Sequence, residues 1–335
     1  MHGDPLMEVT DAMPEDVVLL KAALDRLRLQ DRCANETLAA VGPLTLNVGN
    51  AGTAFRFLTA YCAQLQGCEV VLDGCERMRH RPIGPLVEAL RTLGAKIDYV
   101  GEEGFPPLHI KGQKIHNAQC TMHNEVSSQF ASALELIGVP CDAPASPYLT
   151  MTREVMRNHP QEKDWSSAAF WYEYVAIHGG EIELPGLRQD SLQGDRVVAD
   201  IFQPLGVDTL YTNACVRIRG SIHHSHESGA RSTIHIDFSS CPDLYPAVAM
   251  TCKVLGCRLQ ATGIENLRYK ESDRIASVEA MLSTPQGQIV KTEHDHRIAM
   301  AAMVAGYKVD DEQCVAKSYP NFKRELCKLL SHVEA

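Results

Sequence analysis

An internal repeat constrains this chain more than any other feature of its sequence. Three segments place two glycines seven residues apart around an alternating stretch, and each follows an apolar run with helical spacing. These segments are Gly67–Gly74, Gly179–Gly186 and Gly256–Gly263. The alternation predicts a short strand, and the preceding run predicts a helix. A repeat of this kind indicates a fold assembled from several copies of one mixed unit.

The glycine spacing continues beyond two of these strands. Gly94 and Gly206 each lie twenty residues after the last glycine of the first and second copies. A glycine there supplies the left-handed conformation that ends a helix, so helices are predicted over 86–93 and 197–205. Pro204 is expected to kink or shorten the second of these helices.

The third copy departs from the pattern. Ser283 stands where the glycine is expected, and a turn with proline and glycine follows it, so the copy is predicted to be shortened near 283–290. A chain of 335 residues is also longer than one hydrophobic core usually supports. We therefore expect two α/β domains, over 1–165 and 166–335.

The charge balance excludes several classes of partner. The chain has 42 acidic residues, 32 Lys and Arg residues and a formal net charge of −10, so neither nucleic acid nor an acidic membrane is an expected partner. The sequence shows neither a membrane-spanning run nor a signal peptide, which favours a cytoplasmic protein. Scattered cysteines, and a histidine group at His223, His224 and His226 in a Ser- and Gly-containing stretch, predict no metal site.

Two positively charged segments suit the binding of anions. Residues 50–53 form a loop that enters a predicted helix, where Gly52 lets the backbone approach an anion and Arg56 adds a charge. An ordinary N-cap in this loop is the alternative. Three arginines also stand within five residues at another predicted helix start, at Arg77, Arg79 and Arg81. Cations there oppose the helix dipole, so a bound anion is favoured over a solvated basic turn.

Three polar segments have both a structural and a functional interpretation. Ser127-Ser128-Gln129 opens a predicted helix over 130–137, either as an N-cap or as a group that holds a phosphate. Asp243 precedes an apolar helix and by itself indicates an N-cap. Lys270 and Arg274 share a helical face if a helix already begins there, and an exposed charged turn is the alternative.

The order of these motifs resembles that of the EPSP synthase family. The motifs are Asn50-Ala51-Gly52-Thr53-Ala54 with Arg56, Arg77-Met78 with Arg81-Pro82, Ser127-Ser128-Gln129, Gln193-Gly194-Asp195, Pro242-Asp243, Asn266 with Lys270-Glu271-Ser272-Asp273-Arg274, Asp295-His296-Arg297, and Lys317. Each motif alone is weak, whereas eight in one order are specific. The resemblance extends over residues 50–330.

The resemblance implies an α/β, two-domain enolpyruvyl-transferase fold, with three βαβαββ units in each domain and the active site between the domains. It implies transfer of the enolpyruvyl group of phosphoenolpyruvate to the 5-hydroxyl of shikimate 3-phosphate, with release of phosphate, in aromatic amino-acid biosynthesis. These two molecules are the implied partners, and no cofactor is implied because the chemistry is addition and elimination. Four anionic groups must meet in such a site, which requires several Arg and Lys side chains. A monomer is expected.

The same resemblance implies a role for individual residues. Asp243 takes the proton of the 5-hydroxyl, Glu271 donates a proton to the methylene carbon, and Lys270 lies beside it as a third catalytic residue. Phosphoenolpyruvate is implied to bind Gly52, Arg56, Arg77, Gln129, Arg274, Arg297 and Lys317. Shikimate 3-phosphate is implied to bind Ser127, Ser128, Gln129, Tyr148, Asp243, Asn266 and Lys270.

The sequence departs from the family pattern in ways that favour weakened binding and little transferase activity. The family's Lys-Ser-x-Ser-x-Arg segment has no counterpart before Asn50, so the first repeat is expected to be incomplete and the first domain truncated at its start. Ala145 and Ser146 stand where the family has Ser followed by Lys or Arg, which shifts or removes one hydroxyl contact. Two alternatives stay open. One is transfer to UDP-N-acetylglucosamine, whose enzymes share the Gly74-Cys75 pair, and the other is binding of shikimate 3-phosphate without turnover.

Overall fold

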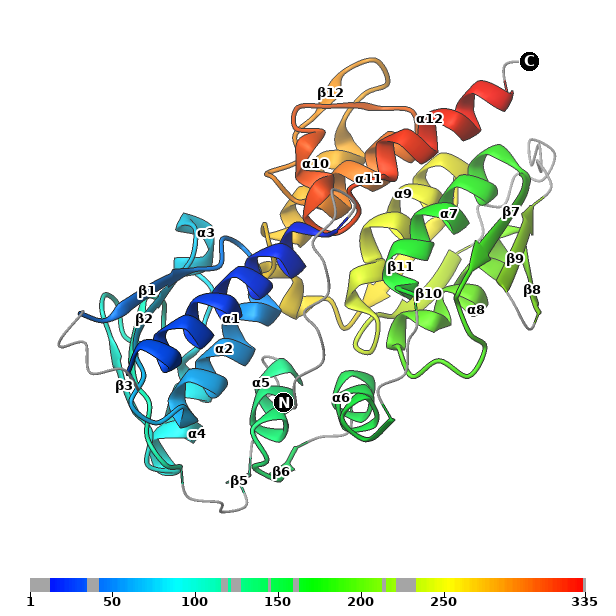
Figure 1. Ribbon diagram of the computed structural model, residues 1–335. Helices are drawn as coiled ribbons and strands as arrows, with labels where there is room; N and C mark the ends of the chain where they lie inside the picture. Colours follow the sequence, from blue (N-terminus) through cyan, green and yellow to red (C-terminus); the bar gives the residue numbers. More distant parts are fainter. Residues whose placement is uncertain are drawn as a thin grey trace.

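Helices and strands gather around two hydrophobic cores. The computed structural model describes residues 13–34, 42–115, 120–121, 128–143, 146–158, 163–212, 215–220 and 233–333. One core collects buried side chains from Ala23 to Leu149, and the other collects those from Trp165 to Leu326. Figure 1 shows two lobes, with the blue and cyan elements in one and the yellow to red elements in the other. The domain limits expected from the sequence stay a prediction.

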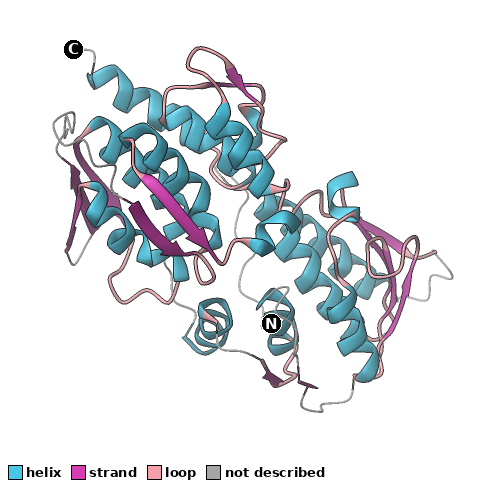
Figure 2. Ribbon diagram, turned by 180° about the vertical axis from the view of Figure 1, so that it is seen from behind, coloured by secondary structure: helices cyan, strands magenta, loops and turns pink. Residues whose placement is uncertain are grey.

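The first lobe is built on a four-stranded mixed sheet. Its elements are α1 (Glu15–Ala34), β1 (Leu44–Asn47), α2 (Gly52–Gln64), β2 (Glu69–Asp73), α3 (Glu76–Arg79), α4 (Gly84–Thr92), β3 (Lys96–Tyr99) and β4 (Leu108–Lys111). The strand order is β1-β2-β4-β3, in which β1 and β2 are parallel and the other pairs are antiparallel. Helices α1, α2 and α4 lie along one face of this sheet (Figure 2). From β1 to β4 the chain follows the βαβαββ order that the resemblance implied, with α3 as a short addition.

Four short elements follow the first sheet, and the second lobe begins after them. These four are β5 (Cys120–Thr121), α5 (Ser128–Leu136), β6 (Cys141–Asp142) and α6 (Pro147–Asn158). The second lobe contains α7 (Trp165–His178), β7 (Gly180–Pro185), η1 (Gly194–Val197), α8 (Val198–Phe202), η2 (Gln203–Leu205), β8 (Val207–Tyr211), β9 (Cys215–Gly220), β10 (Thr233–Asp237), η3 (Pro242–Leu244), α9 (Tyr245–Leu255), β11 (Arg258–Thr262), η4 (Glu265–Tyr269), α10 (Arg274–Ser283), β12 (Ile289–Val290), α11 (His296–Val304), β13 (Lys308–Val309), η5 (Gln313–Lys317) and α12 (Phe322–Val333).

The sheets of the second lobe are smaller than that of the first. Strands β7, β9 and β8 form an antiparallel sheet in that order, while β10 pairs with β11 and β12 pairs with β13 in parallel. After α10 the chain reaches β12 through residues 284–288, which contain no strand. In the first lobe, two antiparallel strands follow α4 instead. None of the described helices is long and apolar enough to cross a lipid bilayer.

Local sequence signals account for these elements. Strand β2 buries Val70 and Leu72, which alternate with more exposed residues as the pattern predicted. Gly94 follows α4 with a φ of 97° and Gly206 follows η2 with a φ of 90°, so both adopt the expected left-handed conformation. Pro204 lies in the 3₁₀ turn η2 directly after α8, and the α-helix is therefore shortened as predicted. The histidine group at 223–226 lies outside the described residues.

Candidate active site

Arg274 connects three carboxylates in the interior of the second lobe. It opens α10, its side chain is fully buried, and its Nη1 donates to Asp243 Oδ1 at 2.8 Å. Its Nη2 donates to Glu271 Oε2 at 2.6 Å, and its Nε donates to Asp295 Oδ2 at 2.9 Å. A buried charge is costly unless it is paired. These contacts therefore hold three carboxylates around one cation.

The starts of two helices fix this network in place. Asp273 caps α10 by accepting a backbone N–H bond of 3.3 Å, and Asp295 caps α11 by accepting one of 3.0 Å from Arg297. A capping residue takes a non-helical backbone, so α10 begins only at Arg274. Lys270 therefore lies in the preceding loop, and the condition for a helical face shared with Arg274 is not met.

Asp243 has three cations around its carboxylate. Besides its bond from Arg274, its Oδ1 lies 3.3 Å from Lys270 Nζ and its Oδ2 lies 3.3 Å from Arg297 Nη2. Burial by itself raises the pKa of the Asp243 carboxyl, but Arg297, Lys270 and Arg274 together hold it well below its usual range. Asp243 is therefore ionised, as a proton acceptor must be.

Glu271 has two cationic partners, one of which also contacts the first lobe. Lys317 Nζ donates to Glu271 Oε1 at 2.6 Å and lies 3.4 Å from Asp16 Oδ2 on α1. Burial raises the pKa of Glu271, whereas Lys317 and Arg274 lower it, and their combined effect keeps the pKa well below its usual range. Glu271 must therefore gain a proton before it can donate one.

Two arginines of the first lobe bind backbone carbonyls of the second lobe. Arg77 in α3 donates through Nε to Lys270 O at 3.1 Å and through Nη2 to Arg268 O at 2.9 Å. Arg81, just after α3, donates through Nε to Tyr269 O at 3.1 Å. These bonds attach the arginine segment of the first lobe to the segment that precedes Glu271, although the two segments are far apart in the sequence.

The third arginine of that segment has a different partner. Arg79 forms an ion pair of 2.6 Å with Asp73 Oδ2 within the first lobe. Because α3 ends at Arg79 and α4 begins at Gly84, the arginines do not occupy the first turn of one following helix, as the sequence suggested. Instead, Arg77 and Arg79 lie in a separate short helix before Pro82.

Gly52 and Arg56 lie in the first turns of α2, next to Arg81. A Cβ atom at Gly52 would lie 2.5 Å from Arg81 Nη2, so a glycine leaves room for that guanidinium. Arg56 is 5% exposed, and its Nη1 donates to Gly52 O at 2.8 Å. Burial and the charge of Arg81 lower the pKa of Arg56 to about 9. Among the described residues, no carboxylate forms an ion pair with Arg56, Arg77 or Arg81.

Helix α5 brings a further predicted residue to the Gly52 loop. Gln129 Nε2 donates to Thr53 Oγ1 at 2.9 Å, which places Gln129 beside the start of α2. Ser128 opens α5, next to Gln129 in the chain. Ser127 lies outside the described residues.

Two other predicted residues come from α6 and η4. Tyr148 is half-buried at the start of α6, where burial, followed by the nearby Asp195 and Asp243, raises the pKa of its hydroxyl. Asn266 lies in η4, four residues before Lys270, and its side chain is exposed. The structure therefore brings Tyr148 close to the proposed base.

Several residues of the site were not predicted. Asp295 and His296 stand in a motif that the sequence showed, and Arg81 stands in the arginine cluster, so these three had a usable signal. His296 is 3% exposed, and burial followed by the charge of Lys317 lowers its pKa to about 3, which leaves the ring neutral. Asp16 had no local signal, because only the fold brings it to Lys317.

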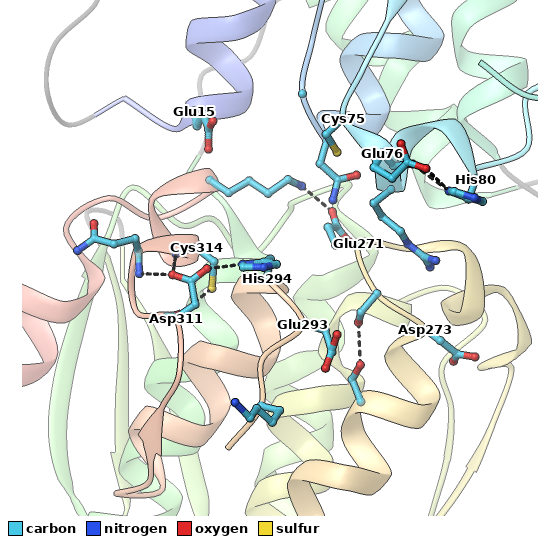
Figure 3. A pocket seen from close by; sticks show the side chains of 18 of the residues that line it. Glu15, Cys75, Glu76, His80, Glu271, Asp273, Glu293, His294, Asp311 and Cys314 are labelled. Atoms are coloured by element: carbon cyan, nitrogen blue, oxygen red, sulfur yellow. Dashed lines mark hydrogen bonds and ion pairs between the residues drawn. The ribbon is translucent and has the colours of Figure 1, made fainter. Parts of the chain in front are cut away.

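A cavity of about 1130 Å³ lies between the lobes next to these groups. Its lining includes three of the predicted site residues, namely Arg77, Glu271 and Lys317, together with Asp16 from α1. Figure 3 shows Glu271 among the lining side chains, between His80 of the first lobe and His294 of the second. A small molecule in this cavity would therefore contact both lobes and reach Glu271, the proposed proton donor.

A βαβαββ unit in the first lobe, and a cation-rich candidate site to which both lobes contribute, are the arrangement expected of an enolpyruvyl transferase. Residues 10–141, 152–289 and 282–326 match the family described as EPSP synthase (3-phosphoshikimate 1-carboxyvinyltransferase), and the chain belongs to this family.

Individual relatives and solved structures that resemble this chain carry the name of the same family. The chain is 33% identical to the 3-phosphoshikimate 1-carboxyvinyltransferase of Bacteroides fragilis, over 86% of this chain and 83% of the relative. It is 32% identical to the enzyme of the same name from Methanoculleus marisnigri, over 85% and 79% of the two chains. The structure of EPSP synthase from Acinetobacter baumannii matches with a TM-score of 0.60 and 23% identity, over 86% and 79%, which shows a shared fold.

Proposed function

We propose that this chain transfers the enolpyruvyl group of phosphoenolpyruvate to the 5-hydroxyl of shikimate 3-phosphate and releases phosphate, as its family does. The reaction takes place where the arginines of the first lobe meet the ion-pair network of the second. Phosphoenolpyruvate binds among Gly52, Arg56, Arg77, Gln129, Arg274, Arg297 and Lys317. Shikimate 3-phosphate binds among Ser127, Ser128, Gln129, Tyr148, Asp243, Asn266 and Lys270.

One observation carries this proposal. Arg56, Arg77 and Arg81 have no carboxylate partner among the described residues, and Arg77 and Arg81 lie against the carbonyls just before Glu271. Arg56 and Arg81 are buried and Arg77 is half-buried. Cations without a carboxylate partner in such positions favour a bound anion, because charge-assisted bonds replace the water that burial removes. Asp243 completes the site as the second acid–base group. Two anionic substrates therefore fit better here than one neutral ligand.

The ion pairs of Asp243 and Glu271 link substrate binding to proton transfer. An incoming phosphate or carboxylate competes with Asp243 for Arg297 and with Glu271 for Lys317. Loss of a cationic partner raises the pKa of a carboxyl group toward its ordinary value. Asp243 then accepts the hydroxyl proton while that oxygen attacks C2 of phosphoenolpyruvate. Glu271, once protonated, gives its proton to C3.

The second half of the reaction reverses part of these steps. The tetrahedral adduct carries its phosphate on C2, and the nearby cations stabilise the negative charges of that adduct. Glu271 then takes a proton back from C3 as the bond from C2 to the phosphate breaks, which restores the double bond and leaves the product ether. The proton held by Asp243 leaves with the phosphate. No electron is transferred, so the protons and the phosphate account for all the changes.

The reaction is tested by steady-state release of phosphate from phosphoenolpyruvate with different acceptors. The full chain is supplied with shikimate 3-phosphate, with UDP-N-acetylglucosamine, or with no acceptor. We expect phosphate only with shikimate 3-phosphate. Release with the nucleotide sugar would favour the related transferase. Calorimetric binding of shikimate 3-phosphate without release would favour the binding-only alternative.

We extend the proposal to a monomer in the cytoplasm. Both halves of the site come from one chain, so no second copy is needed to complete it. Both proposed substrates are small metabolites. Light scattering of the purified chain at micromolar concentration measures the oligomeric state, and a mass of twice the monomer would contradict this part of the proposal.

A further inference from the structure

A second buried carboxyl group lies beside Asp243 and has no place in the mechanism above. Asp195, in η1, is 3% exposed. Its Oδ2 accepts a hydrogen bond from Ser166 Oγ on α7. Its Oδ1 is buried and has no hydrogen-bond partner within the described part of the chain. A buried oxygen without a partner is costly for an ionised carboxylate.

Tight packing at Gly194 places this carboxyl beside the site. A Cβ atom at Gly194 would overlap the carbonyl oxygen of Ser240 and would lie 3.2 Å from Pro147 Cβ. The first contact brings η1 against the turn that carries Asp243. The second brings η1 against the start of α6, which carries Tyr148. Glycine thus lets three segments, distant in sequence, meet at Asp195.

Gln193 anchors the same segment to the start of α7. Its side-chain oxygen accepts from Trp165 N at 2.9 Å, and its Nε2 donates to Lys163 O at 2.8 Å. The backbone on both sides of Gly194 is therefore held. Asp195 cannot move away from the site without breaking these contacts.

The charges that face Asp195 come from four segments. The facing groups are Asp243 and Cys241 near η3, Arg297 on α11, Asp164 at the cap of α7, and Tyr148 on α6. Burial, followed by the charge of Asp243, raises the pKa of Asp195 to about 7, while the pKa of Asp243 is held low. Two carboxyl groups with separated pKa values commonly divide acid and base roles.

We propose that Asp195 is a positioning residue that controls, through Arg297, how readily Asp243 accepts a proton. While Asp195 is neutral, Arg297 is free to pair with Asp243 and weakens it as a base. Once Asp195 is ionised, it competes for Arg297 and repels the charge of Asp243, so Asp243 becomes the stronger base. This inference rests on the proposed function, because it concerns the base of that reaction. It predicts that turnover rises as Asp195 loses its proton.

The pH profile of kcat with shikimate 3-phosphate tests this inference. The wild-type chain should show a rise in kcat centred near neutral pH. Asp195→Asn keeps the shape but stays neutral, so this rise should disappear, with about tenfold lower kcat at alkaline pH and KM little changed. An Asp195→Asn profile that keeps the wild-type rise would overturn the inference. An absence of wild-type turnover would instead count against the proposed function.

Ser166 provides a second variant that keeps the carboxyl group. Its hydroxyl favours the ionised form of Asp195, so Ser166→Ala should move the rise in kcat to higher pH. Ser167→Ala is the matched control on the same turn of α7, because Ser167 Oγ bonds Asp164 and not Asp195. Equal profiles for Ser166→Ala and Ser167→Ala would contradict the inference.

A spectroscopic measurement tests the interaction between Asp195 and Asp243 without any need for turnover. Carbon-13 NMR of the full chain, labelled at the aspartate carboxyls, follows Asp195 and Asp243, with signals assigned from their Asn variants. We expect Asp195 to titrate near neutral pH and the Asp243 signal to shift in the same range. In Asp195→Asn, the shift of Asp243 should be absent. Titration of Asp195 near pH 4 would overturn the inference. So would an Asp243 signal that does not shift while Asp195 titrates.

Discussion

Buried charges link binding to chemistry at the scale of single residues. Asp243 and Glu271 keep their charges because cations replace the water that burial removes. Burial, followed by the charge of the neighbouring Arg81, lowers the pKa of Arg56 instead. A bound anion changes both groups at once, since it neutralises the arginines and competes with the carboxylates. In the proposed mechanism, substrate binding therefore also prepares Asp243 to act as the base.

Replacement of Asp243 tests its role as the base. Asp243→Asn should lower kcat by about 10²-fold or more, because a general base contributes about that much, while binding of shikimate 3-phosphate stays largely intact. Phosphate release and calorimetric titration measure the two effects. Asp208→Asn, at an exposed position on β8, is the control. Unchanged turnover in Asp243→Asn would exclude Asp243 as the base.

His296 should make the fold sensitive to acid. Its pKa is about 3 in the folded chain, but about 6.5 in an unfolded chain. Because the folded pKa is depressed, stability is present above about pH 6.5 and is lost as the pH falls toward 3. His296→Gln should reduce the loss in urea midpoint between pH 7 and pH 5. His235→Gln, at an exposed position on β10, is the control, and an equal loss in all three chains would contradict this account.

The residues that meet at the candidate site were largely predictable from the sequence, but their ionisation was not. The family resemblance implied Asp243, Glu271 and Arg274 as site residues, and the structure brings these three into one ion-pair network. The low pKa of Asp243 arises from three cations that approach it from separate segments. Asp195 stood in a motif of the family resemblance, yet only the packing at Gly194 reveals its position beside Asp243, the proposed base.

Glycines and capping residues determine the elements of this chain. The repeated glycines predicted β2, β7 and β11 and the helices before them, because a glycine in the left-handed conformation commonly ends a helix. The start of α10 was less clear, since the sequence allowed a helix from Lys270, but capping by Asp273 moves it to Arg274. The short helix α3 was not predicted, because four residues carry too little periodicity.

Helix α7 contains a carboxyl group that should destabilise the fold at alkaline pH. Glu173 is fully buried, neither oxygen has a hydrogen-bond partner among the described residues, and burial raises its pKa well above the ordinary range. Because the folded pKa is raised, its contribution to stability is present below about pH 4 and is lost as the pH rises through the folded pKa. A neutral apolar side chain avoids that loss.

Glu173→Met tests this expectation. The variant should raise the free energy of unfolding at pH 8 by about 1–3 kcal/mol, with a smaller gain at pH 5. Urea denaturation at the two pH values measures the difference. Glu181→Met, at an exposed position on β7, is the control and should change little. A variant that is less stable than wild type by the same amount at both pH values would contradict the expectation.

At the scale of the whole molecule, contacts between the two lobes combine residues of both lobes into one candidate site. Arg77 and Lys270 lie 193 residues apart in sequence, and their bond joins α3 to the loop before Glu271. Lys317 similarly reaches Asp16 at the start of α1. No local pattern predicts such pairs, because they depend on how the two lobes meet. The resemblance to a family supplied the expectation of a shared site, and the structure supplies the partners.

The paired variants Arg77→Ala and Arg79→Ala test the shared site. Both lie in α3, but Arg77 bonds the second lobe whereas Arg79 pairs with Asp73 of its own lobe. Charge-assisted hydrogen bonds contribute about 1.5–3 kcal/mol, so Arg77→Ala should raise the KM for phosphoenolpyruvate about tenfold to a hundredfold. Arg79→Ala should stay within about twofold of wild type. Equal effects of the two variants on KM would argue against a site shared between the lobes.

Phosphorus-31 NMR of the reaction mixture tests the central claim most directly. The full chain is mixed with phosphoenolpyruvate and shikimate 3-phosphate, and the signals of both substrates and of inorganic phosphate are followed with time. Enolpyruvyl transfer predicts that phosphoenolpyruvate disappears, that inorganic phosphate appears in equal amount, and that the shikimate 3-phosphate signal shifts to that of its enolpyruvyl ether. Both substrate signals unchanged, or phosphate formed while shikimate 3-phosphate stays unaltered, would contradict the claim.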